Sequence, residues 1–496
     1  MKKYFLLLIF LGLLSGGIAQ MSFINVYDSA KMTYPRDIVF NEAGDIFVCT
    51  MAWEWNDYHY NNSIYKLDEN GNLLKTWWEK DTSRYVVEFT RLMIVDNELY
   101  AFGFFDAYLP DQVNPGIFMK KFDQDLIELD SFTYFLDGEQ HQGFFHGSRV
   151  KPQNDNFLYF SSVYGIGTVP PVTPFYLEIA KDGQLKKAVF DRESIGRIFC
   201  NDFIFKNDNS GFLVYAYERD GFNIPFGFIY DYDINLENLV IYPLQNNFRQ
   251  SFTSVPIVDN NVYLSGSYSE YMNPNKQVGV LKMTNSGEVL NSYLFNPSSD
   301  SLSFPAHYNS LDRLPDGSLI MCSSYGLTNQ YLPQNAQSWI SLFKFSPDLE
   351  LMWHHYIGGG ANYEAYSMRV APDDGIVICA GYSPVPPTSL LIKDLMIIKT
   401  DSDGQTVGLN DQNHGIKTSE AILFPNPAQD FVIVDFSLLY KTATLQLIDL
   451  AGRTVMERAL TANHQQVDIS GVPAGAYFYR IFNNKGLEES GKLVVE

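Results

Sequence analysis

One short phrase recurs seven times along the chain, and this repeat constrains the fold more than any other feature. Each copy is a mostly apolar run of six residues, as in DIFVCT, ELYAFG, FLYFSS and NVYLSG. Successive copies are 53, 59, 55, 49, 57 and 57 residues apart when counted between Ile46, Leu99, Leu158, Leu213, Val262, Leu319 and Ile376. So regular a period indicates an array of similar structural units.

The composition of each unit predicts strands. The segments are short and rich in β-branched and aromatic residues, with Asn, Asp and Gly between them. Four antiparallel strands in each of seven units predict an all-β fold, a seven-bladed β-propeller over residues 20–410. Residues 22–27 can supply an outer strand to the last blade, and so can residues 404–409. Two stacked β-sandwiches are the alternative architecture.

The first nineteen residues have the pattern of a secretory signal peptide. Lys2 and Lys3 precede an apolar run, and Gly17 and Ala19 occupy the positions that a signal peptidase inspects. No later run is apolar over the roughly 18 residues that a spanning helix needs. We therefore expect export, with no transmembrane segment after cleavage.

Export makes disulfides possible for the four cysteines. However, Cys49, Cys322 and Cys379 occupy the same position of the repeat in different blades. Neighbouring sheets pack about 10 Å apart, whereas a disulfide needs Cα atoms within roughly 7 Å. Cys200 belongs to no such column, so we expect four buried free thiols.

The chain changes character after the seventh unit. Residues 411–421 are polar and have the composition of a linker. The alternating strands and turns of residues 422–496 predict a small antiparallel β-sandwich.

Several motifs follow in order within residues 422–496. They are a PNP segment, a D-x-x-G-R turn, a P-x-G-x-Y strand and a basic-apolar ending, with key residues Pro425, Asn426, Pro427, Asp449, Gly452, Arg453, Pro473, Gly475 and Tyr477. This segment resembles the C-terminal sorting domain of proteins exported by the type IX secretion system of Gram-negative bacteria. The resemblance implies recognition by that machinery and a protein that is secreted or attached to the outer surface.

Charge and missing motifs exclude several functions. With 57 acidic and 35 basic residues, the net charge of -22 makes nucleic acid and anionic membranes poor partners, unless a local patch departs from the average. The sequence contains no G-x-S-x-G, H-E-x-x-H, phosphate loop or C-x-x-C motif. This favours a non-enzymatic role, and we predict no cofactor and no metal.

Two groups of residues are candidates for ligand binding. The connections from second to third strand are long in every unit, and the first carries Trp53, Trp55 and Tyr58, which suit stacking on sugars or peptides. Alternatively, these rings cover the blade ends.

At the channel, Arg36, Arg91 and Arg149 fall at matching positions of three units and can bind a carboxylate or sulfate. Alternatively, they pair with Asp37, Asp202 or Glu364 and plug the channel.

Three histidines are weak catalytic candidates. His141 and His146 lie in one loop and His307 lies in another, so they can act as acid and base only if the fold brings them together. Solvent-exposed histidines are the alternative.

The sequence thus predicts an exported binding or scaffold module for a glycan, peptide or surface protein. A secreted hydrolase or lyase acting on polysaccharide or peptide is the alternative function.

Overall fold

The computed structural model describes residues 22–27, 32–54, 59–79, 86–106, 116–135, 141–165, 172–191, 198–206, 210–219, 225–237, 240–244, 248–258, 261–268, 277–284, 287–295, 302–327, 337–387, 393–406 and 417–496. Every regular element in these residues is a strand, and the strands pair antiparallel. None of the described residues forms a helix long and apolar enough to cross a membrane. The predicted signal peptide, residues 1–19, lies outside the described residues.

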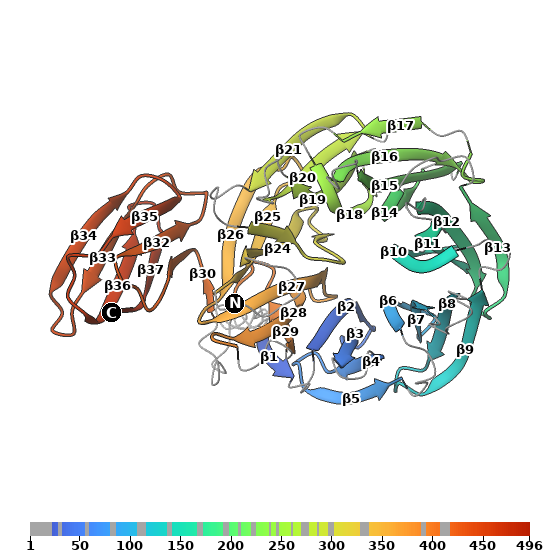
Figure 1. Ribbon diagram of the computed structural model, residues 1–496, viewed down its shortest axis with the longest axis horizontal. Helices are drawn as coiled ribbons and strands as arrows, with labels where there is room; N and C mark the ends of the chain where they lie inside the picture. Colours follow the sequence, from blue (N-terminus) through green and yellow to red (C-terminus); the bar gives the residue numbers. More distant parts are fainter. Residues whose placement is uncertain are drawn as a thin grey trace, which may run out of the picture.

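Seven sheets of the described chain are arranged as blades around a central axis, with the first strand of each blade innermost (Figure 1). Blade one is β2 (Met32–Phe40), β3 (Ile46–Glu54), β4 (His59–Leu67) and β5 (Leu73–Trp78). Blade two is β6 (Val86–Val95), β7 (Glu98–Asp106), β8 (Gly116–Phe122) and β9 (Glu128–Phe135). Blade three is β10 (His141–Gln153), β11 (Asn156–Gly165), β12 (Val172–Ala180) and β13 (Leu185–Phe190).

The remaining blades follow the same order. Blade four is β14 (Ile198–Phe205), β15 (Gly211–Arg219), β16 (Pro225–Asp233) and β17 (Val240–Pro243). Blade five is β18 (Phe248–Val258), β19 (Asn261–Tyr268), β20 (Gln277–Thr284) and β21 (Val289–Phe295). Blade six has a divided inner strand, β22 (Leu302–Pro305) and β23 (Leu311–Arg313), then β24 (Leu319–Leu327), β25 (Trp339–Phe345) and β26 (Leu351–Gly358). Blade seven is β27 (Ala361–Val370), β28 (Ile376–Pro384) and β29 (Asp394–Thr400), completed by an outer strand from the start of the described chain.

That outer strand closes the ring. β1 (Phe23–Tyr27) pairs with β29 from Phe23↔Lys399 to Tyr27↔Leu395. Ile24 and Val26 pack on the core between blades six and seven, while the side chain of Asn25 donates to the Gly71 carbonyl of blade one at 2.8 Å. The seven-bladed propeller is confirmed, and the alternative of two stacked sandwiches is wrong.

Packing between neighbouring blades forms the core. In the described residues, an apolar cluster lies between each adjacent pair of blades, including the pair that joins blade seven to blade one. Burying these faces supplies the main driving force for ring formation. The four cysteines are buried and free, as the repeat predicted.

The C-terminal domain is a separate β-sandwich with its own core. One sheet contains β31 (Ala421–Phe424), β32 (Phe431–Phe436) and β35 (His464–Asp468). The other contains β34 (Thr454–Leu460), β33 (Ala443–Ile448), β36 (Gly475–Phe482) and β37 (Glu488–Val495). Within the segment for which the sequence predicts a linker, residues 417–419 form β30 (Lys417–Ser419), which adds to the outer edge of β26.

Candidate functional site

Bulges in the innermost strands decide which side chains reach the channel. The pairing register of β2 skips Arg36, so that Asp37 lies opposite Cys49. In β6 the register skips Thr90, and Arg91 lies opposite Phe102. Because Cys49 and Phe102 are equivalent in the repeat, the residue of blade one at the position of Arg91 is Asp37 and not Arg36. A bulge adds a residue to one strand and redirects its side chain, so Arg36 takes a different direction from Arg91.

Three carboxylates connect neighbouring blades across the channel wall. Asp37 accepts the backbone N–H of Leu92 at 3.2 Å, and Asp202 accepts that of Ser254 at 2.7 Å. The innermost strand of blade six repeats the contact, because Asp312 accepts the N–H of Val370 at 2.9 Å. Each carboxylate satisfies a donor on the next blade that would otherwise be buried without a partner.

Four cations lie beside these carboxylates. Arg91 and Arg369 approach Asp37, with N–O distances of 3.3 and 3.5 Å. Arg149 and Lys151 approach Asp202, at 3.6 and 3.3 Å. All four distances exceed the usual range for charge-assisted hydrogen bonds, about 2.7–2.9 Å, so the ion pairs are loose.

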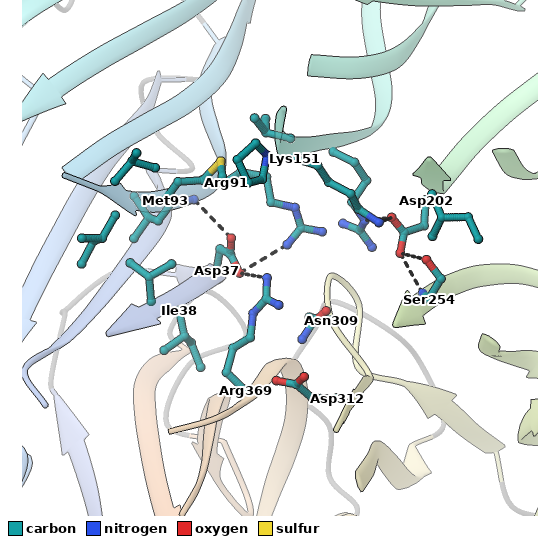
Figure 2. Close-up of a pocket in the computed structure, with 18 of the residues that line it drawn as sticks. Asp37, Ile38, Arg91, Met93, Lys151, Asp202, Ser254, Asn309, Asp312 and Arg369 are labelled. Atoms are coloured by element: carbon teal, nitrogen blue, oxygen red, sulfur yellow. Dashed lines mark hydrogen bonds and ion pairs between the residues drawn. The ribbon is translucent and has the colours of Figure 1, made fainter. Parts of the chain in front are cut away.

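These groups line a cavity of about 800 Å³ in the channel. Figure 2 shows Asp37 between Arg91 and Arg369 on one side, and Asp202 beside Ser254 on the other, around an open centre. The lining includes the last residues of several innermost strands, such as Phe40, Val95 and Val370. Each of those strands ends in the short turn that leads to the second strand of its blade, whereas the long loops follow the far end of that second strand. The cavity therefore lies in the half of the channel opposite the long loops.

The cavity is cationic although the chain is acidic. Its lining holds five Lys and Arg residues against three Asp residues. One of the five, Lys206, pairs with Asp231, which does not line the cavity. Four cations therefore share three carboxylates.

Burial shifts the ionisation of these groups. It lowers the pKa of Arg91 and of Lys151, and the neighbouring Asp37 and Asp202 oppose those shifts. It also raises the pKa of Asp312, which Arg369 opposes. For Arg369, burial acts downward, but Asp37 and Asp312 hold its pKa above the usual value. The pKa shifts of Arg91, Lys151 and Asp312 follow from scarce solvation, which makes a further anion favourable beside the cations, whereas the shift of Arg369 follows from its two carboxylate neighbours.

Arg36 and His307 lie in a separate polar cluster. Arg36 pairs with Glu88 at 2.7 Å and lies 4.6 Å from the Tyr308 ring centre. His307 contacts Glu364 at 2.7 Å, and Glu364 also pairs with Lys393 of blade seven. Although burial acts to raise the pKa of Glu364, Lys393 and His307 hold it well below the usual value.

The cluster around Arg36 and His307 is distinct from the cavity in its lining residues. Of the three predicted arginines, Arg91 and Arg149 line the cavity and Arg36 does not. Each arginine has a carboxylate partner, but the partner of Arg36 is Glu88 and not Glu364. The channel nevertheless keeps an open volume beside Arg91 and Arg149.

The remaining predicted site residues of the propeller cannot be placed by their side chains. Trp55 and Tyr58 lie outside the described residues, and Trp53 is described only as part of β3. His141 and His146 belong to β10, and their side chains also lie outside the described part. Among the described residues, no three His, Cys, Asp or Glu side chains form a group that can hold a metal ion.

Sequence reasoning missed Asp312, Arg369 and Lys151 as cavity residues. The register places Asp312 and Arg369 in a column that is apolar in the five other blades, at Val39, Met93, Val150, Phe203 and Val255. A charge at a position that other repeats keep apolar is the signal that identifies them. Finding it requires aligning the innermost strands, and the bulges obscure that alignment.

The motif residues of the C-terminal domain build its turns and edges. Asn426 donates to the Lys492 carbonyl at 2.8 Å and accepts the Val494 N–H at 2.9 Å, so it fastens β37. Asp449 accepts the backbone N–H of Arg453 at 2.9 Å. Gly452 has a φ of 80°, which other residues adopt only with strain.

The aromatic motif residue closes a loop of the same domain. Tyr477 donates its hydroxyl to the Pro473 carbonyl at 2.6 Å. The spacing P-x-G-x-Y therefore has a direct structural cause. Pro425, Pro427 and Gly475 lie in the same two motif segments.

Comparisons with known proteins identify the C-terminal domain and give distant likenesses for the propeller. The family model described as the secretion system C-terminal sorting domain matches residues 422–496. No curated protein matches the chain. Among solved structures, the chain is similar to the β-propeller domain of the Trilobed protease from Pyrococcus furiosus, at 12% identity over 78% of this chain and 98% of that chain, with a TM-score of 0.38.

Two further solved structures belong to other proteins of similar fold. One is the α-L-arabinanase of Penicillium chrysogenum complexed with arabinobiose, at 10% identity over 77% of this chain and 99% of that chain, with a TM-score of 0.40. The other is the endosialidase of phage phi92, at 8% identity over 95% of this chain and 87% of that chain, with a TM-score of 0.42. These likenesses say nothing about activity. The sorting-domain match makes the chain an exported protein of a Gram-negative bacterium, secreted or surface-attached, in which a seven-bladed β-propeller precedes a type IX secretion C-terminal sorting domain.

Proposed function

We propose that the propeller is a binding module that holds an anionic group of an extracellular glycan, peptide or surface protein in its channel cavity. The observation that carries this proposal is the excess of cations in a chain of net charge -22. Arg91 and Lys151 also donate to the backbone carbonyls of Tyr308 and Phe203. Buried cations whose carboxylate partners are distant nevertheless gain from a further anion, because water no longer solvates them. A volume of about 800 Å³ lies within the usual range for small-ligand sites, about 300–1,000 Å³.

The carboxylates of the cavity support binding over catalysis. Asp37 and Asp202 each accept a backbone N–H and face two cations, so the protein's own groups already occupy these carboxylates. A general acid or base must instead exchange a proton with the substrate. The alternative function, a hydrolase or lyase acting on polysaccharide or peptide, is tested in the same experiment.

The experiment compares matched ligands that differ in charge. Oligomers of galacturonic acid and a sulfated chondroitin oligosaccharide are titrated into the full-length protein, beside neutral galactose oligomers, and every mixture is analysed for products. We expect the charged probes to bind, with affinity that falls as salt is added, and we expect no product. Equal binding of neutral probes, or binding of no charged probe, would contradict the anion site. Product formation would establish the alternative function.

A further inference from the structure

The sorting domain contacts the propeller at blade six, beside β26 and β30 (Figure 1). Thr418 of β30 lies opposite Ile357 of β26, and β31 begins at Ala421. The Phe424 ring lies 4.9 Å from the Trp339 ring. Ile422 is 6% exposed and belongs to the apolar cluster between blades five and six. The two domains therefore share a packed apolar surface.

A carboxylate lies at this interface. Asp435 of β32 is fully buried and accepts a hydrogen bond from the Tyr325 hydroxyl of β24 at 2.5 Å. Its second oxygen lies 2.6 Å from Nδ1 of His464 on β35. Burial raises the pKa of Asp435, and His464 opposes that shift. A buried carboxylate is stable only with such partners, and separating the domains would remove Tyr325 from it.

The rest of this surface is mainly apolar. Residue Ile422 of β31 lies opposite Asp435 in the register. On the propeller side, Tyr356 of β26 is fully buried within electrostatic range of Asp435. Neither β24 nor β31 contains an Asp, Glu, Lys or Arg residue. The hydrogen bond from Tyr325 to Asp435 is thus a polar contact that orients the two domains, together with the one that the Gln337 side chain donates to the Asn426 carbonyl at 3.4 Å.

We propose that blade six is a docking surface for the chain's own sorting domain, and that docking presents this domain to the export machinery in one orientation. The sheet of β31, β32 and β35 supplies the docked face, through Ile422, Phe424 and Asp435. The turn between β33 and β34 in the other sheet is exposed to solvent, because Leu450 is 74% exposed and the side chain of Arg453 is 80% exposed.

Hydrogen exchange on the full-length protein tests the docking. The double variant Tyr325→Phe, Trp339→Ala removes the hydroxyl that Asp435 accepts and the ring that Phe424 contacts. The control Tyr263→Phe removes a hydroxyl that donates to the Pro347 carbonyl at 2.8 Å within the propeller. We expect the double variant to raise exchange in residues 417–424 by about tenfold or more, because it loses both the hydrogen bond and the ring contact between the domains. The control should leave that exchange unchanged.

Two results would overturn the proposal. One is full exchange of residues 417–424 in the wild-type protein, and the other is equal exchange in the wild type and the double variant. Small-angle scattering gives a second readout that does not depend on local exchange. The radius of gyration should increase in the double variant, and an unchanged radius would also contradict docking.

Discussion

At the scale of single residues, Asp202 has two roles. One oxygen accepts the backbone N–H and the hydroxyl of Ser254 on the next blade, at 2.7 and 2.9 Å. The other oxygen faces Arg149 and Lys151 in the cavity. The residue therefore connects two blades and also partly neutralises the site.

Substitutions of Asp202 separate these two roles. Asp202→Ala leaves the Ser254 N–H without its acceptor, so we expect a loss of about 1–3 kcal/mol in the free energy of unfolding. Asp202→Asn keeps an acceptor and should lose less. Urea denaturation measures both, with Asp155→Ala as a control, because the side chain of Asp155 is 98% exposed. Equal losses in the Ala and Asn variants would show that the charge, and not the hydrogen bond, stabilises the blades.

The cysteines give a second prediction at this scale. All four are buried and free, and burial raises the pKa of the Cys200 thiol to about 12. Only the thiolate reacts readily with alkylating reagents. We expect no modification of the native protein at pH 8 and four modified thiols after denaturation, measured by mass spectrometry. Rapid labelling of the native protein, or a mass that indicates a disulfide, would contradict this packing.

At the scale of single elements, β26 carries two buried histidines on opposite faces. His354 stacks on Phe343 with ring centres 4.2 Å apart, and neither of its ring nitrogens has a hydrogen-bond partner among the described residues. Burial lowers the pKa of His355 from 6.5 to about 4, and lowers that of His354 well below its usual value. The two histidines of β26 therefore stay neutral in the folded protein at pH values at which they bind protons in the unfolded chain.

Stability should accordingly fall in mild acid. The unfolded histidines bind protons below pH 6.5, whereas folded His355 stays neutral until about pH 4. The folded state thus loses stability as pH decreases between these values, by about 3 kcal/mol for this residue at 1.36 kcal/mol per unit. Urea denaturation from pH 7 to pH 4.5 measures the slope. His354→Phe removes one of the two groups and should flatten the profile, and an unchanged slope would contradict the account.

The repeat was sufficient to predict the strands themselves but not the direction of every side chain. In blade one, the segments RDIVF, DIFVCT, SIYKLD and NLLKTW correspond to β2, β3, β4 and β5. The bulge that separates Arg36 from the cavity adds one residue without changing the apolar pattern, so it is invisible in sequence. Likewise, no local pattern in the sequence pairs Arg36 with Glu88, because that contact joins two blades.

At the scale of the whole molecule, the ring depends on a strand from far away in the sequence. β1 pairs with β29, and its two faces contact different blades. Neither blade seven nor the contact with blade one is complete without it. Closure therefore couples the start of the propeller to its end, which favours cooperative unfolding.

Charges on the inner face of β1 should open the ring. The double variant Ile24→Asp, Val26→Asp places two carboxylates against the core between blades six and seven, and burying an unpaired charge costs several kcal/mol. We expect a clearly lower melting temperature, measured by calorimetry on the full-length protein. Leu290→Asp is the control, because Leu290 is 49% exposed on an outer strand. Equal melting temperatures for the wild type and the double variant would show that β1 does not close the ring.

The most direct test of the central claim is a calorimetric titration of a galacturonic acid oligosaccharide into wild-type and variant protein. Lys151→Gln and Arg369→Gln each remove one cavity cation, and Arg480→Gln removes an arginine of the sorting domain that pairs with Glu488. We predict that each cavity variant weakens binding by about tenfold or more, and that Arg480→Gln binds as the wild type does. Equal affinity for all four proteins would contradict a binding site in the channel.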